Sequence, residues 1–289
     1  MNHDRPMPSP AVVVGIDGSC AAVTAALWAV DEAVSRDIPL RLLYAVTPRT
    51  SLPDPHQAAR DLATAEVAVQ EAVMAVESLE QPVKVEVQIV QDRPEHALTA
   101  ASRSATMVCL GALGRDHITG RRVGSVAASL ARTAHCEVAI IRHHDPTPRS
   151  PGWVVAEVDD SPGSTRVLER ALEEADLRRA PVRVLTTWQA RYTDIHDPRA
   201  VADINRLTRA HLEQRLGRSR RLHPDLQVEA VAARGTTINY LAAHADRIQL
   251  IVVAQERRSG LAEVAGPAAH AALHDTDCSV LICERHGAL

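Results

Sequence analysis

The stretch Val-Val-Val-Gly-Ile-Asp-Gly-Ser at residues 12–19 decides the fold, because a close copy of it occurs later in the chain. At residues 154–161, which is 142 positions further on, the sequence reads Val-Val-Ala-Glu-Val-Asp-Asp-Ser. The apolar run at 138–141 aligns at the same offset with the run at 280–283. Agreement over such distances indicates a duplication, and a period this long makes each copy a domain rather than a solenoid repeat.

The join between the two copies is rich in proline. Residues 145–152 contain three prolines and one glycine, and such a segment continues neither a helix nor an inner strand. We therefore predict four regions, namely a disordered N-terminus over 1–10, a first domain over 11–144, a linker over 145–152 and a second domain over 153–287.

Short apolar runs alternate with amphipathic stretches inside each copy. In the first copy we expect strands near 11–16, 40–46, 85–90, 107–110 and 138–141, and helices near 20–36, 57–79, 94–103 and 124–134. In the second copy we expect strands near 153–158, 182–188, 227–232, 249–253 and 280–283. Unbroken apolar strands suit a parallel sheet that helices cover on both faces. The pattern predicts an α/β fold with two tandem, doubly wound parallel sheets of five strands each.

The last predicted strand of each copy lies at a sheet edge in domains of this kind. An open edge invites pairing with another strand. We therefore expect the two sheets to form a pseudo-dimer, with the strand at 138–141 against the strand at 280–283.

Composition excludes several classes of protein. The 289 residues are 46% apolar and 24% charged, which is ordinary for a globular chain with a buried core. A net charge of −4 offers no electrostatic footprint for nucleic acid, and the 2% of aromatic residues offer no platform for stacking bases. No apolar run approaches the roughly 20 residues of a membrane span, the start is unlike a secretory signal, and the five cysteines form no CxxC pair. We expect a cytoplasmic protein without membrane insertion.

Two segments of the first copy follow predicted strands, which is where ligands of doubly wound sheets bind. Asp17, Gly18 and Ser19 follow the first strand, and a glycine-rich loop that runs from Gly111 into a helix at Gly124 follows the fourth. Glycine lets backbone approach a ligand without a Cβ in the way, and the N–H groups at a helix N-terminus favour an anion. On composition alone, a flexible connection between strand and helix remains the alternative.

Polar side chains in these segments also have two interpretations each. The Ser125 hydroxyl either caps the helix or binds a phosphate oxygen, and Asp17 either contacts the ligand or caps the helix that follows it. Three arginines in the loop are placed to neutralise phosphate charge, namely Arg115, Arg121 and Arg122.

The loop has a regular spacing: Gly111, two residues, Gly114, nine residues, then Gly124 and Ser125. Together with the opening strand at 12–19 and the duplication, this spacing resembles the ATP-binding members of the universal stress protein family, in the tandem form typical of actinobacteria. The resemblance covers nearly the whole chain. It implies the Rossmann-like fold of adenine nucleotide alpha hydrolase-like domains.

The resemblance implies roles for single residues. Asp17 would hold the adenosine moiety, with Gly15 beside it and with the hydrophobic position after the second strand falling near Val46. The residues that would cradle the ribose and phosphates are Gly111, Gly114, Gly124, Ser125 and Val126, with Arg115 beside them. The implied cofactor is ATP, with or without Mg²⁺, and further homodimerisation is common in the family.

The second copy departs from this pattern. Ala254 replaces the first glycine of the loop, Arg257 the second, and Pro267 stands at the place of the serine, which removes a hydroxyl and a backbone N–H donor. Glu157 replaces the glycine of the opening strand and adds an anion near the place of the ligand. Although Asp159 persists, we predict that the second copy does not bind ATP in the same mode.

A pair of histidines in the second copy has the spacing of a zinc site. His270 and His274 are four residues apart on a predicted helix. Because no third ligand is evident at a suitable spacing, we interpret the pair as part of a polar helix face and expect no metal site.

The sequence supports three functions of different classes. The first, which we favour, is a nucleotide-dependent regulatory or stress-response protein whose ATP-bound state a protein partner recognises. The second is a slow ATPase in which a loop carboxylate such as Asp116 orients water. The third is an interaction module with two vestigial sites, against which the intact first motif argues. Because neither a Walker loop nor an evident nucleophile–base pair is present, we expect no catalytic residues and at most slow ATP hydrolysis.

Overall fold

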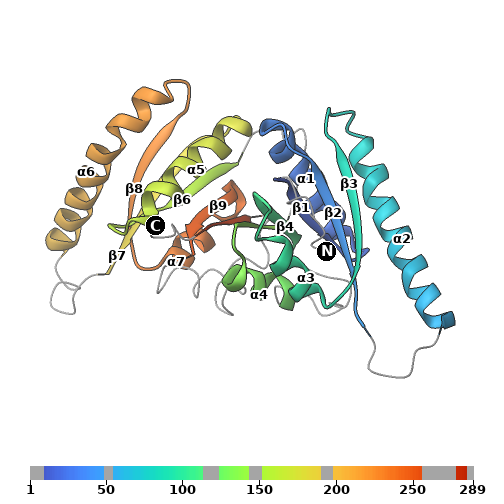
Figure 1. Ribbon diagram of the computed structural model, residues 1–289. Helices are drawn as coiled ribbons and strands as arrows, with labels where there is room; N and C mark the ends of the chain where they lie inside the picture. Colours follow the sequence, from blue (N-terminus) through green and yellow to red (C-terminus); the bar gives the residue numbers. More distant parts are fainter. Residues whose placement is uncertain are drawn as a thin grey trace, which may run out of the picture. The chain divides into compact units, whose positions relative to one another are not determined.

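A computed structural model of the protein describes residues 10–48, 55–112, 124–142, 152–189, 198–255 and 278–284. The chain divides into two compact units, residues 1–144 and 145–289. Each unit contains a parallel β-sheet flanked by helices (Figure 1). The predicted fold class, α/β with tandem doubly wound sheets, is confirmed, and the strands of both units and the helices of the first unit end within two residues of the predicted positions.

The first unit alternates strand and helix throughout its described part. Its elements are β1 (Val12–Ile16), α1 (Cys20–Ser35), β2 (Leu40–Val46), α2 (Pro55–Glu77), β3 (Val85–Gln91), α3 (Pro94–Ala101), β4 (Met107–Gly111), α4 (Ser125–Thr133) and β5 (Glu137–Ile141). The strand order is β3-β2-β1-β4-β5, and all four pairings are parallel.

The second unit repeats this plan. Its elements are β6 (Trp153–Glu157), α5 (Gly163–Leu177), β7 (Val182–Trp188), α6 (Pro198–Leu222), β8 (Val228–Arg234), α7 (Thr237–Ala243), the 3₁₀ helix η1 (Ala245–Arg247), β9 (Ile248–Ala254) and β10 (Ser279–Cys283). The order β8-β7-β6-β9-β10 matches that of the first unit, again with parallel pairs. The predicted pairing of 138–141 with 280–283 stays a prediction, as does the linker, of which 145–151 lie outside the described residues.

The first helix of each unit ends in the same local structure. After α1, Asp37 has a φ of 52°, Ile38 N–H donates to the Ala33 carbonyl at 3.1 Å and Asp37 N–H donates to the Val34 carbonyl at 3.1 Å. This is the Schellman arrangement, in which one left-handed residue satisfies the last helical carbonyls. After α5, Arg179 has a φ of 49°, and Ala180 N–H donates to the carbonyl of Ala175. The duplication is therefore visible in the backbone as well as in the sequence.

A buried glutamate also recurs in this helix. Glu32 of α1 is fully buried and pairs with Arg36 at 2.7 Å, and Glu174 of α5 is fully buried and pairs with Arg178. In the second unit Arg170, which is 1% exposed, adds a further ion pair with Glu174. The first unit has Trp28 at the matching position. A buried charge requires such partners because burial removes its hydration.

The strand order of the first unit fixes where a ligand can bind. β1 pairs with β2 on one side and with β4 on the other. α1 packs against α2, and α3 packs against α4. The strand order therefore reverses between β1 and β4, and a crevice beyond their carboxyl ends is expected at such a switch point.

Candidate functional site

A cavity of about 440 Å³ opens in the first unit at the carboxyl ends of β1 and β4. This volume lies in the range of small-molecule sites. The described residues that line it come from β1, α1, β2, α3, β4 and α4, and from the turn after β1: Gly15, Ile16, Asp17, Ser19, Ala22, Leu43, Tyr44, Ala45, Pro94, Leu98, Leu110, Gly111, Gly124, Ser125, Val126 and Ala127.

The turn between β1 and α1 forms one part of the wall. Gly18 has a φ of 80°, in the left-handed region that glycine adopts without strain. Ser19, and not Asp17, is the N-cap of α1, because its Oγ accepts from Ala22 N–H at 3.1 Å. Asp17 Oδ1 accepts from Ser19 N–H at 2.9 Å. The interpretation of Asp17 as the helix cap is therefore not supported, and its carboxylate lies in the wall of the cavity.

Gly15 leaves room in the cavity. A Cβ on this residue would lie 2.6 Å from Leu110 Cδ2 and 3.2 Å from Leu98 Cδ1. Both atoms are ends of flexible side chains, and both leucines line the cavity. A side chain at position 15 would therefore push into the site rather than into the backbone.

Gly111 has a different reason to be glycine. A Cβ on Gly111 would lie 2.6 Å from the carbonyl carbon of Ala21 and 2.7 Å from its oxygen. The absent side chain thus allows the start of α1 to pack on the end of β4. The sequence interpretation assigned this glycine to close approach of a ligand, whereas the structure shows a close approach of two backbone segments.

The N-terminus of α4 forms another part of the wall. Gly124 is the N-cap residue of α4, and no side chain caps the helix there. Its N–H donates to the Ala112 carbonyl at 3.1 Å. Ser125 is the first residue of the helix and is exposed, so it is not the cap. Helix geometry leaves the N–H groups of Ser125, Val126 and Ala127 without an intrahelical acceptor. These donors and the helix dipole favour an anion beside them.

Most of the predicted site residues that the structure describes lie together in this cavity. They are Gly15, Asp17, Gly111, Gly124, Ser125 and Val126. Val46 ends β2 and is not among the described lining residues; Leu43, Tyr44 and Ala45 of the same strand line the cavity instead. Gly114 and Arg115 lie outside the described residues, as do Arg121, Arg122 and Asp116.

The sequence interpretation placed the contribution of β2 at Val46 rather than at Leu43, Tyr44 and Ala45, and it did not find the contribution of α3. Leu43 pairs with Gly15 and Tyr44 with Ile16 across the sheet. The strand register was a usable signal, since the residues beside the end of β1 must border the same crevice. Pro94 and Leu98 of α3 carried no motif, and their place follows only from the packing of α3 near β1 and β2.

The second unit has a carboxylate at the place of Gly15. Glu157 is 2% exposed, and its Oε1 accepts from the hydroxyl of Thr237 at the start of α7. The strand registers of the two units align Thr237 with Pro94, which lines the cavity of the first unit. The Glu157 side chain therefore extends toward the region that corresponds to that cavity.

Asp159, the counterpart of Asp17, is held by hydroxyl groups. Its Oδ1 accepts from Ser161 N–H at 2.9 Å, from Ser161 Oγ at 2.5 Å and from Ser164 Oγ at 2.7 Å. In the first unit, Ala22 stands at the place of Ser164 and offers no hydroxyl. The Ser164 hydroxyl therefore holds Asp159 through a bond that Ala22 cannot make to Asp17.

The packing of helix on strand also differs there. Ala254 ends β9 at the position of Gly111, and Gly163 opens α5 at the position of Ala21. A Cβ on Gly163 would lie 3.4 Å from Ala254 Cβ, which is an ordinary contact. The strand alanine is accommodated because the start of α5 leaves it that space.

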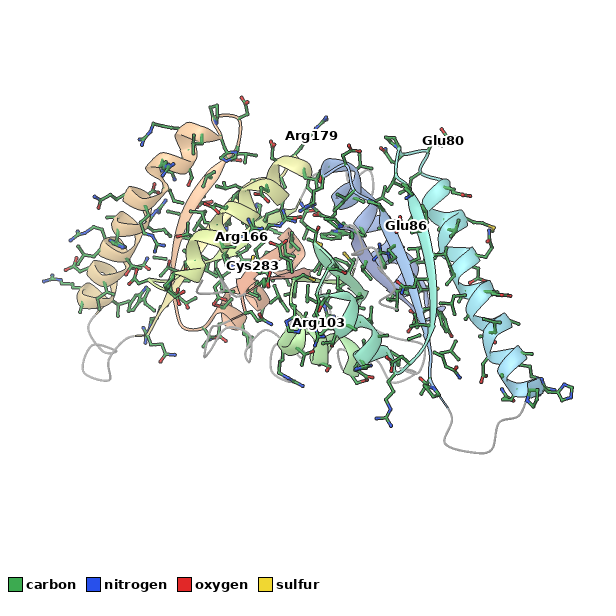
Figure 2. The ribbon with its side chains drawn as sticks, viewed as in Figure 1. Glu80, Glu86, Arg103, Arg166, Arg179 and Cys283 are labelled. Carbon is green, nitrogen blue, oxygen red and sulfur yellow. The ribbon has the colours of Figure 1, made fainter. Side chains whose placement is uncertain are left out.

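The carboxyl groups of Glu86 and Asp92 have lowered pKa values, and neither residue is among the described residues that line the cavity. Hydrogen bonds from Lys84 and Arg41 lower the pKa of Glu86, which lies on β3 (Figure 2). Hydrogen bonds from His96 and from the backbone N–H of Arg93 lower the pKa of Asp92. Among the described residues, no group of three His, Cys, Asp or Glu side chains is arranged to hold a metal ion. The predicted pair His270 and His274 lies outside them.

Among the helices that the structure describes, none combines the length and the apolar character that a membrane span requires.

The fold and the cavity define a tandem α/β protein with a cavity at the switch point of its first sheet. Comparisons with known proteins give the family. The Universal stress protein family model matches residues 10–142 and again 154–284. Universal stress protein Rv2028c of Mycobacterium tuberculosis is 43% identical over 284 residues, which are 98% of this chain and 98% of that protein. Universal stress protein Rv3134c of the same organism is 44% identical over 253 residues, covering 86% and 89%.

The fold is also that of solved members. The crystal structure of a universal stress protein from Archaeoglobus fulgidus superposes with a TM-score of 0.69 at 16% identity, over 96% of this chain and 97% of that one. The chain therefore belongs to the universal stress protein family, in its tandem form, as its motifs predicted.

Proposed function

We propose that the first unit binds ATP in the cavity described above and that the protein is a nucleotide-dependent regulator. The observation that carries this proposal is the meeting of Asp17 and the N-terminus of α4 in one cavity of about 440 Å³. The N–H groups at the helix start suit phosphate oxygens. The Asp17 carboxylate suits hydroxyl donors of a nucleoside. Leucine side chains from β2, α3 and β4 suit the apolar faces of a base.

Mg²⁺ fits this arrangement as a companion of the phosphates. The ion usually keeps several waters and takes one or two carboxylates together with substrate phosphates. Asp17 is the carboxylate that the described lining offers. We propose that Mg²⁺, when it accompanies ATP, is held chiefly by the nucleotide and neutralises part of its charge.

We propose a regulatory rather than a catalytic role. The titratable side chains among the described lining residues are Asp17 and Tyr44, and Ser19 is used as the cap of α1. Such a set supports binding and offers no paired nucleophile and base. We further propose that the protein acts in the cytoplasm, where four buried thiols would stay reduced, and that a protein partner recognises the ATP-bound state.

The substitution Val126→Glu tests the site, because it separates binding from folding. An acidic residue in the first turn of a helix is stabilising or neutral for the fold. In the cavity it would face the phosphates and weaken ATP binding at least tenfold, by an order of 1–2 kcal/mol of repulsion. Isothermal titration gives the affinity, and Val126→Gln is the matched neutral control. Unchanged ATP affinity in Val126→Glu would contradict the proposed site.

The same titration tests the second unit. We propose one ATP per chain, because Glu157 and Thr237 extend into the region where the first unit has its cavity. The stoichiometry should therefore be one for the unmodified chain and should approach zero for Val126→Glu. A second site, or a full site that survives this substitution, would show that the second unit binds ATP after all.

A further inference from the structure

The helices that follow the second strand of each unit have diverged in charge. α2 carries one arginine and four acidic residues, a net charge of −3, whereas α6 carries seven arginines and two acidic residues, a net charge of +5. The helices that follow the first strands, α1 and α5, each keep a net charge of −2. Opposite charge therefore arose at one pair of matching helices and not at the other. α2 runs alongside β3, and α6 alongside β8 (Figure 1).

The surface of α2 combines apolar and acidic side chains. Val67 is 60% exposed and Met74 is 57% exposed, and both lie on the side of the helix opposite its buried residues. Glu66 and Glu71 flank them and are exposed. Within the part of the chain that the structure describes, neither glutamate makes an ion pair. The helix thus presents apolar surface bordered by uncompensated negative charge.

The surface of α6 has the complementary composition. Leu207 and Leu222 are each 65% exposed. Several arginines of this helix are used locally: Arg206 pairs with Asp203 at 3.0 Å, Arg215 with Asp160 at 3.5 Å, and Arg220 with Glu213.

Two arginines near Leu222 differ from these. Arg218, one turn before Leu222, and Arg221 are exposed and make no ion pair among the described residues. Since an exposed arginine that pairs locally is partly neutralised, these two contribute most of the unbalanced positive charge at this end of α6.

We propose that α2 of one copy of the protein docks against α6 of a second copy. Apolar side chains would be buried at the centre of the contact, with glutamates facing arginines at its rim, as in many protein interfaces. Helices of 23 and 25 residues are of similar length, about 34 Å and about 37 Å. The proposed assembly is a two-fold dimer, to which each copy contributes one surface of each kind. This proposal is independent of nucleotide binding.

Charge reversal on either helix tests the contact. Sedimentation velocity from about 1 µM to about 100 µM protein at about 50 mM NaCl should show a dimer. The pair Glu66→Lys and Glu71→Lys, or the pair Arg218→Glu and Arg221→Glu, should each weaken the dimer at least tenfold. Raising NaCl to about 500 mM should weaken the unmodified dimer as well, because the charges are exposed.

Mixing the two variant proteins distinguishes a contact between copies from one within a chain. Each variant alone places like charges in both of its contacts. A mixture forms a heterodimer in which lysines of α2 meet glutamates of α6 at one contact and native charges meet at the other. We expect the mixture to recover dimer to within about threefold of the unmodified affinity. Failure of the mixture to recover would overturn the proposal.

Matched controls place the same changes elsewhere. Arg103→Glu (Figure 2) and Glu169→Lys alter exposed charges that belong to neither α2 nor α6 and should leave the dimer unchanged. A chain that stays monomeric throughout would overturn the proposal. The proposal would also be overturned if the protein is a monomer that binds a DNA duplex, or vesicles of equal phosphatidylglycerol and phosphatidylcholine, through α6. Loss of that binding in the variant Arg218→Glu and Arg221→Glu would assign it to this helix.

Discussion

The first strand ends in a cavity in one unit and in a cluster of hydrogen bonds in the other. In the first unit Gly15, Gly18 and Ala22 present little side chain around Asp17. In the second unit a glutamate, an aspartate and a serine stand at those positions, and Glu157 bonds to Thr237 while Ser164 bonds to Asp159. The strands, the strand order and the helix ends are the same. The fold thus depends on the buried strands and caps, whereas the residues at the strand ends line a cavity in one unit and form side-chain hydrogen bonds in the other.

We expect the largest loss of stability from a change to the buried charges in which the two units differ. Arg170→Ala removes one of the partners of buried Glu174, and breaking a buried pair costs about 3 to 5 kcal/mol. Urea denaturation measures the loss. Glu173→Ala is the control, because that partner of Arg170 is 53% exposed and should matter by less than about 0.5 kcal/mol. A loss below about 1 kcal/mol for Arg170→Ala would mean that buried Glu174 does not depend on Arg170 while Arg178 is present.

The next largest effect is expected on ATP affinity, when a residue of the second unit is placed in the first. Gly15→Glu copies Glu157 into the first unit, where the carboxylate would enter the cavity beside Leu98 and Leu110. ATP affinity should fall at least a hundredfold, about 2.7 kcal/mol, as measured by titration. Pro94→Thr added to Gly15→Glu supplies the hydroxyl that Glu157 uses, so the double variant should regain thermal stability without regaining ATP. Gly15→Ala is the control for added volume alone. Retained ATP binding in Gly15→Glu would refute the comparison.

We expect a smaller loss of stability at the position where the backbones of α1 and β4 meet. Gly111→Ala brings a Cβ against the main chain of Ala21 and should cost about 2 kcal/mol of stability. Because the contact is with the carbonyl group, Ala21→Gly should not relieve it. Ala254→Gly in the second unit removes a methyl that the start of α5 accommodates and should cost less, about 1 kcal/mol. Equal losses at the two positions, measured by urea denaturation, would contradict this difference.

The smallest effect concerns pH. The pKa of Glu86 is held below its ordinary value of 4.5 by Lys84 and Arg41. Because the folded pKa is lowered, the contribution of Glu86 is present above about pH 4.5 and disappears as pH falls through the folded pKa. Glu86→Gln should therefore reduce the loss of stability between about pH 5 and about pH 3 by less than about 1 kcal/mol, since the pair is partly exposed.

The second unit offers the comparison for this pH effect. Arg183 pairs with Glu229 at 3.1 Å, and Gln227 stands at the place of Lys84. Glu229→Gln should change the acid stability profile less than Glu86→Gln does. A larger change for Glu229→Gln would show that Lys84 is not the main partner.

The sequence was sufficient for the fold, because the duplication and the apolar runs locate the described strands of both units and the helices of the first unit within two residues. It located Gly15, Asp17, Gly111 and the start of α4 at the cavity. It could not assign Gly111 to the packing of α1 on β4, because this depends on a distance between segments far apart in the chain. It also missed Leu43 and Leu98, whose apolar side chains resemble any core residue until the sheet register and helix packing are known.

The helix–strand contact at Gly111 bears on the history of the duplicated gene. Where a helix starts as close to the strand end as α1 does, the strand glycine cannot change to alanine first, whereas a helix start with the spacing of α5 accepts either residue. The helix start must therefore have moved before the second copy acquired Ala254, if its ancestor had a glycine there. Recombination between the copies is restricted in the same direction, since β4 can be combined with α5 but β9 cannot be combined with α1 without a steric clash.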